Sequence, residues 1–87
     1  MSTSTKLRWV DRSRGAIHDL DLKHITITVH RHIHWPPDVW LCSTKNPSLM
    51  NQFALESKDL EAAQQEALRL VAALLAKITS DVRKALA

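Results

Sequence analysis

The sequence predicts an α+β fold in which a three- to four-stranded antiparallel sheet carries one long C-terminal helix packed across one face. Residues 57–86 place apolar side chains at the period of an α-helix. The segments before them, within 6–56, alternate apolar and polar residues as half-buried strands do. The links between these segments are too short for crossover connections, so neighbouring strands must be antiparallel. We therefore expect one domain over residues 1–87, with residues 1–5 disordered.

The C-terminal helix is predicted over residues 57–86, with Ser57 as the N-cap. Acidic residues follow in the first turn and basic residues lie toward the end, which suits the helix dipole. The apolar stripe that must be covered consists of Leu60, Ala67, Leu68, Val71, Leu74, Leu75, Ile78, Val82, Ala85 and Leu86.

This helix is predicted to extend beyond the sheet. Its stripe is about 43 Å long at 1.5 Å per residue, whereas a ten-residue strand spans only about 33 Å. Val82 and Leu86, near the end, would then need another cover, which a second copy of the chain could supply. Leu70 lies outside the stripe among small residues on the predicted solvent side, where a second helix could approach. We therefore expect a homodimer with Leu70, Val82 and Leu86 in the interface.

Five segments before the helix have strand character. Alternation is strictest over Lys23–Trp35, the predicted central strand, with β-branched residues on one face and histidines on the other. A turn at Asp11–Gly15 contains the only glycine, at a position that favours positive φ. The other predicted strands are Lys6–Val10, Ala16–Leu22, Val39–Thr44 and Asn51–Glu56, the last with Phe53 and Leu55 inward. In Val39–Thr44 periodicity does not decide whether Val39 and Leu41 or Trp40 and Cys42 point into the core.

Three histidines stand out as a candidate metal site. His30, His32 and His34 are two residues apart, so on a strand they would project from the same face. Neutral imidazoles in this arrangement can share a metal ion, and weak zinc or nickel binding is expected. The alternative is that a solvated strand face simply tolerates histidine.

The basic residues are unevenly distributed along the chain. The net charge is +3, and residues 1–34 hold six Lys/Arg, three Asp and all five histidines. Nucleic-acid binding is therefore an alternative function, with phosphate contacts from Arg8, Arg12, Arg14 and Lys23. Base-stacking platforms usually carry Phe or Tyr, however, and this chain has one phenylalanine and no tyrosine.

The remaining composition favours neither catalysis nor a membrane. Phosphate-binding loops need several glycines, and no paired carboxylates or nucleophile motif accompany the single glycine, so we expect no enzyme and no cofactor. The longest apolar run, Leu70–Ala76, is far shorter than the about 20 residues of a membrane-spanning helix. One cysteine and an N-terminus without an apolar run predict a cytoplasmic protein.

Several segments together resemble small phage- and prophage-encoded proteins of about this size. They are the region from Leu7 through Trp9 to Gly15, ITITVHR at 25–31, the strand with Trp40, and LESKDLEAAQQEAL at 55–68. The order of strands and helix also resembles the dsRNA-binding-domain-like half of HicB-type antitoxins, although their acidic, glycine-rich hairpin is absent here. The resemblance to phage proteins implies no catalytic motif. The sequence thus favours a non-enzymatic protein that acts through protein–protein contact.

Overall fold

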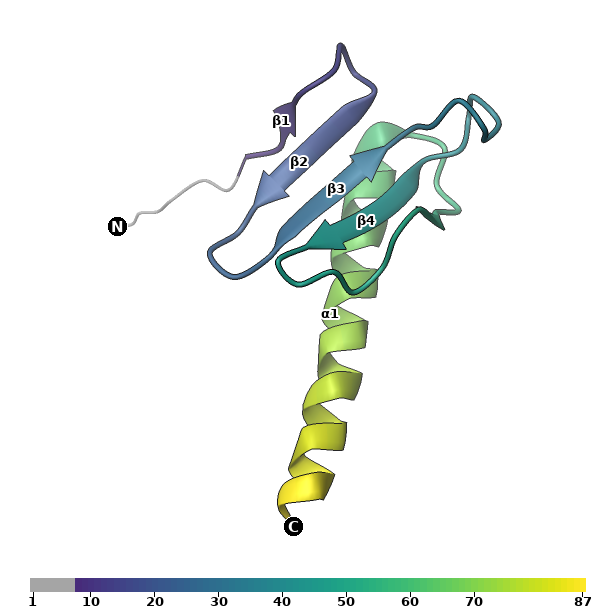
Figure 1. The fold of residues 1–87 in the computed structure, drawn as a ribbon. Coiled ribbons are helices and arrows are strands. Elements are labelled where there is room, and N and C mark those ends of the chain that lie inside the picture. Colours follow the sequence, from purple (N-terminus) through teal and green to yellow (C-terminus); the bar gives the residue numbers. More distant parts are fainter. Residues whose placement is uncertain (1–7) are drawn as a thin grey trace.

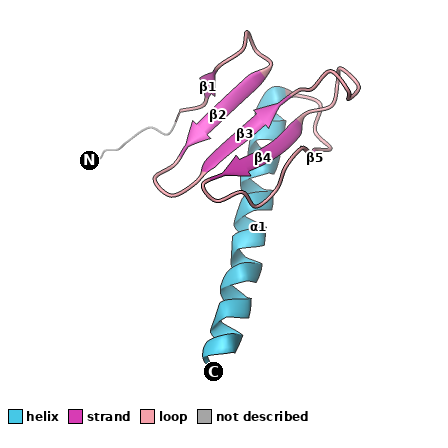
Figure 2. Cartoon of the chain, viewed as in Figure 1, coloured by secondary structure: helices cyan, strands magenta, loops and turns pink. Residues whose placement is uncertain are grey.

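The computed structural model describes residues 8–87, so the segment 1–5 and the first two residues of the predicted strand Lys6–Val10 lie outside the described residues. Of the remaining three residues of that predicted strand, only Val10 belongs to a strand. The chain forms a five-stranded antiparallel sheet in the order β1-β2-β3-β4-β5, and α1 crosses one face of it (Figure 1). The elements are β1 Val10–Asp11, β2 Ile17–Asp21, β3 Thr26–His30, β4 Leu41–Lys45, β5 Phe53–Ala54 and α1 Leu60–Leu86 (Figure 2). The predicted α+β class is confirmed, and the strand count is five because a two-residue strand pairs at each edge.

The β1–β2 turn forms where the sequence predicted it. Arg14 and Gly15 both adopt positive φ, at 46° and 87°. The Asp11 carboxylate accepts hydrogen bonds from the backbone N–H groups of Gly15, at 2.8 Å, and Ser13, at 3.1 Å. This local capping and the single glycine explain why the chain reverses here.

The central strand is shorter than predicted. β3 ends at His30, which pairs with Ile17, the first residue of β2. The N–H of Arg31 still donates to the carbonyl oxygen of Ala16. Beyond that point no partner strand continues, so residues 31–38 leave the sheet as an exposed loop. The prediction that the strand continues to Trp35 is therefore wrong, because alternation continues in the sequence after the pairing has ended.

The core lies between the sheet and the first half of α1. The helix-facing side of the sheet carries Ile27 and Val29 of β3 together with Trp40 and Cys42. Trp40 and Cys42 are therefore the inward pair of residues 39–44, a choice that periodicity left open. Leu41 is also fully buried, but on the opposite face, where it pairs with His30 and Ala54. The other members of the core cluster are Leu55, Ala63, Ala67 and Val71. Of the predicted inward pair on the fifth strand, Leu55 is buried and Phe53 is half exposed.

The start of α1 is fixed by three separate contacts. Asp59, and not the predicted Ser57, is the N-cap, because its side chain accepts from the N–H of Ala62. The Glu66 carboxylate accepts from the N–H of Glu56, at 3.0 Å, and from both the N–H and the hydroxyl of Ser57. The Trp40 indole N–H donates to the carbonyl oxygen of Lys58, at 3.0 Å. The helix therefore leaves the sheet in a defined direction.

Candidate protein interface

The second half of α1 projects beyond the sheet. The helix has 27 residues and is about 40 Å long. Its buried residues, Ala63, Ala67 and Val71, all lie in the first half, where small side chains allow close approach to the sheet. From 72 to 87 every residue except Leu74 is exposed. We call residues 73–87 the free end of α1, and Figure 1 shows it extending past the strands. The predicted overhang is confirmed.

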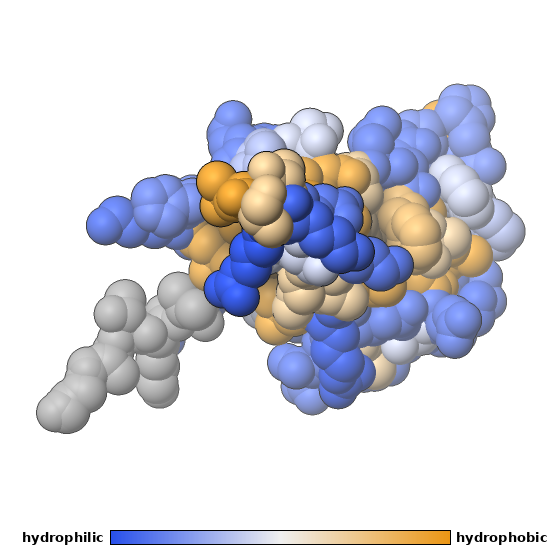
Figure 3. Space-filling model, turned by 90° about the horizontal axis from the view of Figure 1, so that it is seen from below, coloured by the Kyte–Doolittle hydropathy of each residue, from blue (hydrophilic) through white to orange (hydrophobic). Residues whose placement is uncertain are grey.

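The free end carries an uncovered apolar stripe. The exposed fractions are 40% for Leu75, 39% for Ile78, 53% for Val82 and 80% for Leu86. Figure 3, viewed toward the helix end, shows apolar residues next to hydrophilic ones on this surface. An amphipathic helix segment of this kind, with no sheet beneath it, has the character of a contact surface. Val82 and Leu86 thus lie where the sequence placed them.

Leu70 does not belong to this free surface. It is half-buried and packs against the core cluster, and Ala63, one of the small residues on the predicted solvent side, is fully buried. The face of the helix that meets the sheet is rotated relative to the predicted stripe, because Ala63 and Ala67 contact the sheet more closely than the bulkier Leu68 does. The expectation that Leu70 lies on the solvent side of the helix is therefore wrong.

A second apolar surface lies beside the helix where the sheet ends. It is a shallow groove of about 360 Å³ lined by Leu49, Met50, Phe53, Leu70, Ala73, Leu74 and Lys77. Phe53 is half exposed within it. The groove connects the β4–β5 region to the beginning of the free end, so apolar surface continues from the sheet onto the helix.

The β3–β4 loop forms a third surface, at the other end of the sheet. Its residues 31–38 are all exposed, including Ile33 at 92%. The backbone makes local turns, with the N–H of Trp35 donating to the carbonyl oxygen of His32 at 3.0 Å. A hollow of about 460 Å³ is lined by Ala16, Arg31, His32, Ile33, Trp35 and Pro37. Because the sequence assigned residues 31–35 to a strand, the first part of this loop was not predicted.

The three predicted metal ligands are not on one strand face. His30 ends β3, and its Nε2 lies 2.8 Å from the Ser43 hydroxyl. Burial lowers the pKa of His30 below its ordinary value, and the nearby His32 adds to that effect. His32 and His34 lie in the loop with ring centroids 5.0 Å apart. Within residues 8–87, no three His, Cys, Asp or Glu side chains converge on one point. Of the three predicted metal ligands, only His32 and His34 therefore lie side by side.

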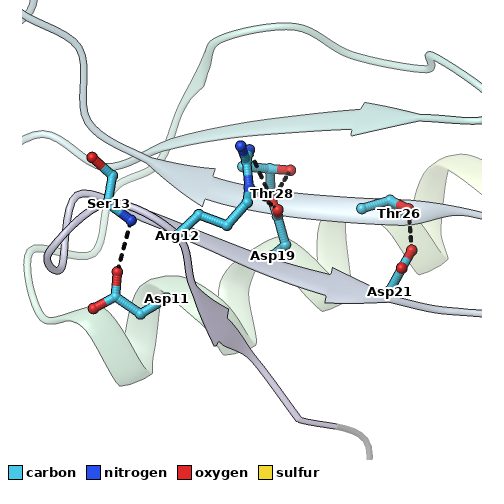
Figure 4. Close-up of polar contacts among 7 residues, drawn as sticks. All are labelled: Asp11, Arg12, Ser13, Asp19, Asp21, Thr26 and Thr28. Carbon is cyan, nitrogen blue, oxygen red and sulfur yellow. Dashed lines mark hydrogen bonds and ion pairs between the residues drawn. The ribbon is translucent and has the colours of Figure 1, made fainter.

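The predicted phosphate-binding residues are exposed but do not form one patch. Arg12 and Arg14 lie in the β1–β2 turn, whereas Lys23 lies in the β2–β3 turn at the other end of β2. The Arg12 guanidinium pairs with the Asp19 carboxylate, which also accepts from the Thr28 hydroxyl at 2.7 Å (Figure 4). Arg8, just before β1, is exposed as well.

The sheet face opposite α1 carries acidic as well as basic side chains. Burial raises the pKa of Asp19, but the hydrogen bonds from Thr28 and Arg12 outweigh it, and the net pKa is lowered. Asp21 accepts from the Thr26 hydroxyl on the same face (Figure 4). Ionised carboxylates on this face oppose the binding of phosphates.

A buried histidine escaped the sequence analysis. His18 is only 8% exposed, and its Nε2 donates to the carbonyl oxygen of Gly15 at 3.0 Å. Its ring meets Trp40 edge-on, at 5.9 Å between centroids, while Arg31 lies over the same indole. The sequence did contain a signal for this. His18 lies two residues before Leu20, so on a strand both side chains project from the same, inward face.

Among the described residues, no helix is both long enough and apolar enough to cross a membrane. Comparison of the chain with protein-family models, curated proteins and solved structures found no match.

Proposed function

We propose that this chain is a small non-enzymatic protein of phage or prophage type that acts through protein–protein contact, with the free end of α1 as its contact surface and a homodimer as its working form. The observation that supports this most directly is the exposure of Leu75, Ile78, Val82 and Leu86 on a helix segment beyond the sheet. An α-helix of this length gains most of its stability from covering its apolar face. A partner on this stripe would therefore stabilise the free end.

The experiment is thermal unfolding at several protein concentrations, because a dimer has a midpoint that rises with concentration and a monomer does not. Val82→Asp places a charge in the middle of the stripe and should abolish that dependence. Ser80→Asp is the matched control: it introduces the same charge in an exposed position of the same helix turn, away from the stripe. If the wild-type midpoint is the same at all concentrations, the homodimer is refuted.

Nucleic-acid binding is the second candidate, and it rests on the end of the sheet that holds Arg14, Arg31 and the exposed loop histidines. Arg31 reaches this end because its N–H bonds to Ala16, next to the β1–β2 turn. Binding through phosphates must weaken as salt rises, because counterions are released. A double variant with Arg12→Glu and Arg14→Glu should weaken DNA or RNA binding at low salt. The absence of any binding at micromolar protein would eliminate this candidate.

A further inference from the structure

We infer that the hollow beside the β3–β4 loop binds an unpaired base of a single-stranded nucleic acid, which stacks on Arg31 and Trp35. This inference rests on nucleic-acid binding, the second candidate function, and it specifies the kind of nucleic acid and the place where it binds. Three observations support it: the loop is fixed at both ends, planar side chains line the hollow, and the charges around it suit phosphates.

The β3–β4 loop is exposed, yet contacts with the rest of the fold hold both of its ends. At the start, the Arg31 guanidinium lies over the Trp40 ring, and the Arg31 N–H donates to the carbonyl oxygen of Ala16 at 2.9 Å. At the end, the Asp38 carboxylate lies 3.6 Å from the Lys58 ammonium group. A loop that is held in this way loses little conformational freedom on binding, so a ligand meets a preformed surface.

Two planar side chains line the hollow of about 460 Å³ beside this loop, Trp35 and Arg31. Trp35 is 37% exposed, which leaves part of its indole open. One face of the Arg31 guanidinium lies on Trp40, and because the side chain is exposed, the other face can receive a second planar group. Bases stack on both aromatic rings and guanidinium planes. The hollow thus offers a flat ring two surfaces of the right kind.

The charges around the hollow suit a negatively charged strand. Residues 31–37 contain no Asp or Glu, and Asp38, which follows them, is paired with Lys58. Among residues 8–87, neither Arg14 nor Arg31 has a carboxylate within 4.0 Å. Both guanidinium groups are exposed and therefore free to meet phosphates.

Arg14 is the residue best placed to contact a phosphate next to the bound base. It lies in the β1–β2 turn, which is at the same end of the sheet as the β3–β4 loop (Figure 1). The hydrogen bond between Arg31 and Ala16 joins the two segments. Asp11 is the one carboxylate of that turn, and its Oδ1 already accepts from the N–H groups of Ser13 and Gly15. The strand would therefore pass this end of the sheet and avoid the face that carries Asp19.

A membrane surface and a nucleic-acid duplex both fit this place less well. Insertion into lipid needs apolar side chains that project together. Only Ile33, at 92% exposure, projects fully from the loop, whereas Trp35 lines the hollow. In a duplex the bases are already paired and stacked on one another, so a base must leave the stack before it can enter the hollow.

The test measures, by fluorescence anisotropy, the binding of labelled oligothymidylate and oligouridylate of about 12 nucleotides, and of a DNA duplex of the same length. Trp35→Leu removes the indole but keeps an apolar side chain, and it should weaken the binding of single strands about tenfold. Trp35→Phe should restore most of that loss. Phe53→Leu is the matched control, because it removes a half-exposed ring from the separate groove beside α1 and should leave the affinity unchanged.

The dependence of binding on salt separates stacking from phosphate contact. Arg14→Gln should reduce the slope of log Kd against log salt concentration by about 0.7, because one phosphate contact is lost. Trp35→Leu should lower the affinity and leave this slope unchanged. Because Trp35 lies in an exposed loop, its variants should keep the thermal midpoint of the wild type.

Tighter binding of single strands than of the duplex, with a loss in Trp35→Leu but not in Phe53→Leu, would support the inference, and the stronger of the two single strands would identify DNA or RNA. Equal binding of the duplex, or wild-type affinity in Trp35→Leu, would overturn the inference but leave nucleic-acid binding intact. If no strand binds at micromolar protein, the inference and the nucleic-acid candidate both fail. Cosedimentation with vesicles of phosphatidylserine and phosphatidylcholine, without binding of any strand, would assign the loop to a membrane surface and also overturn it.

Discussion

The guanidinium of Arg31 lies over the indole ring of Trp40, 4.3 Å from its centroid. Trp40 is buried and is the residue whose N–H fixes the entry to α1. A residue at the start of an exposed loop is thereby joined to the core and, through Trp40, to the helix.

Arg31→Ala should reduce the free energy of unfolding by about 1 kcal/mol, because a cation–π contact at an exposed site is lost. Lys23→Ala, which removes an exposed positive charge in a turn, should change it by less than about 0.5 kcal/mol. Urea denaturation of the two variants measures the difference. Equal effects would show that the stacking on Trp40 does not stabilise the fold.

Glu66→Ala should destabilise the junction between β5 and α1, because the N–H groups of Glu56 and Ser57 lose their acceptor. We expect a loss of about 1 kcal/mol, since water can replace the carboxylate at this partly exposed site. Burial raises the pKa of Glu66, but its hydrogen bonds outweigh this and the net pKa is lowered. The contribution of Glu66 is therefore present above its unfolded pKa and disappears as pH falls through its folded pKa.

The measurement is urea denaturation of wild type and Glu66→Ala at pH 7 and at pH 3. The difference between the two proteins should be smaller at pH 3. A difference that is independent of pH would contradict the role assigned to the ionised carboxylate.

His30 should make stability depend on pH in a higher range. Burial lowers its folded pKa, so the folded protein binds this proton less readily than the unfolded chain, whose pKa is about 6.5. Its contribution is present above that unfolded value and is lost as pH falls through the folded pKa. The thermal midpoint should therefore fall on acidification below about pH 6.5, before the carboxylates titrate. His30→Asn should make the thermal midpoint less dependent on pH in this range. An unchanged pH profile in His30→Asn would contradict the role assigned to His30.

The loop histidines give a separate prediction on metals. We expect Zn²⁺ or Ni²⁺ to bind weakly to His32 and His34, whose rings lie 5.0 Å apart, and acidification should weaken binding because only an unprotonated imidazole nitrogen can hold a metal ion. His32→Ala should abolish binding and leave the thermal midpoint nearly unchanged, because the residue is exposed. His30→Ala should keep the affinity, because His30 faces Ser43. Isothermal titration calorimetry of wild type, His32→Ala and His30→Ala measures the metal affinity. A loss of affinity in His30→Ala, with normal affinity in His32→Ala, would show that His30 is the ligand instead.

The sequence was most informative where local periodicity and tertiary structure agree. The helix, the turn at Gly15 and the overhang beyond the sheet could all be predicted from spacing and length. β3 could not be bounded, because Ile33 and Trp35 continue the alternation but β2 has no residues left to pair with them. Strand ends depend on the partner strand, which a single segment does not specify.

The candidate site was only partly predictable for the same reason. Val82 and Leu86 followed from helix length alone, whereas Leu70 required knowledge of the rotation of α1 on the sheet. That rotation is set by the small residues Ala63 and Ala67, whose close approach outweighs the bulk of Leu68. The first part of the β3–β4 loop was missed because residues 31–35 suit a strand.

Sedimentation equilibrium of the unmodified chain, from below one micromolar to tens of micromolar, tests the central claim most directly. We expect an average mass that rises with concentration from 9.9 kDa toward twice that value. A variant that ends at Lys77 lacks Ile78, Val82 and Leu86 and should stay a monomer throughout. A wild-type mass that stays at 9.9 kDa up to tens of micromolar would contradict the claim that the free end of α1 joins two copies of the chain.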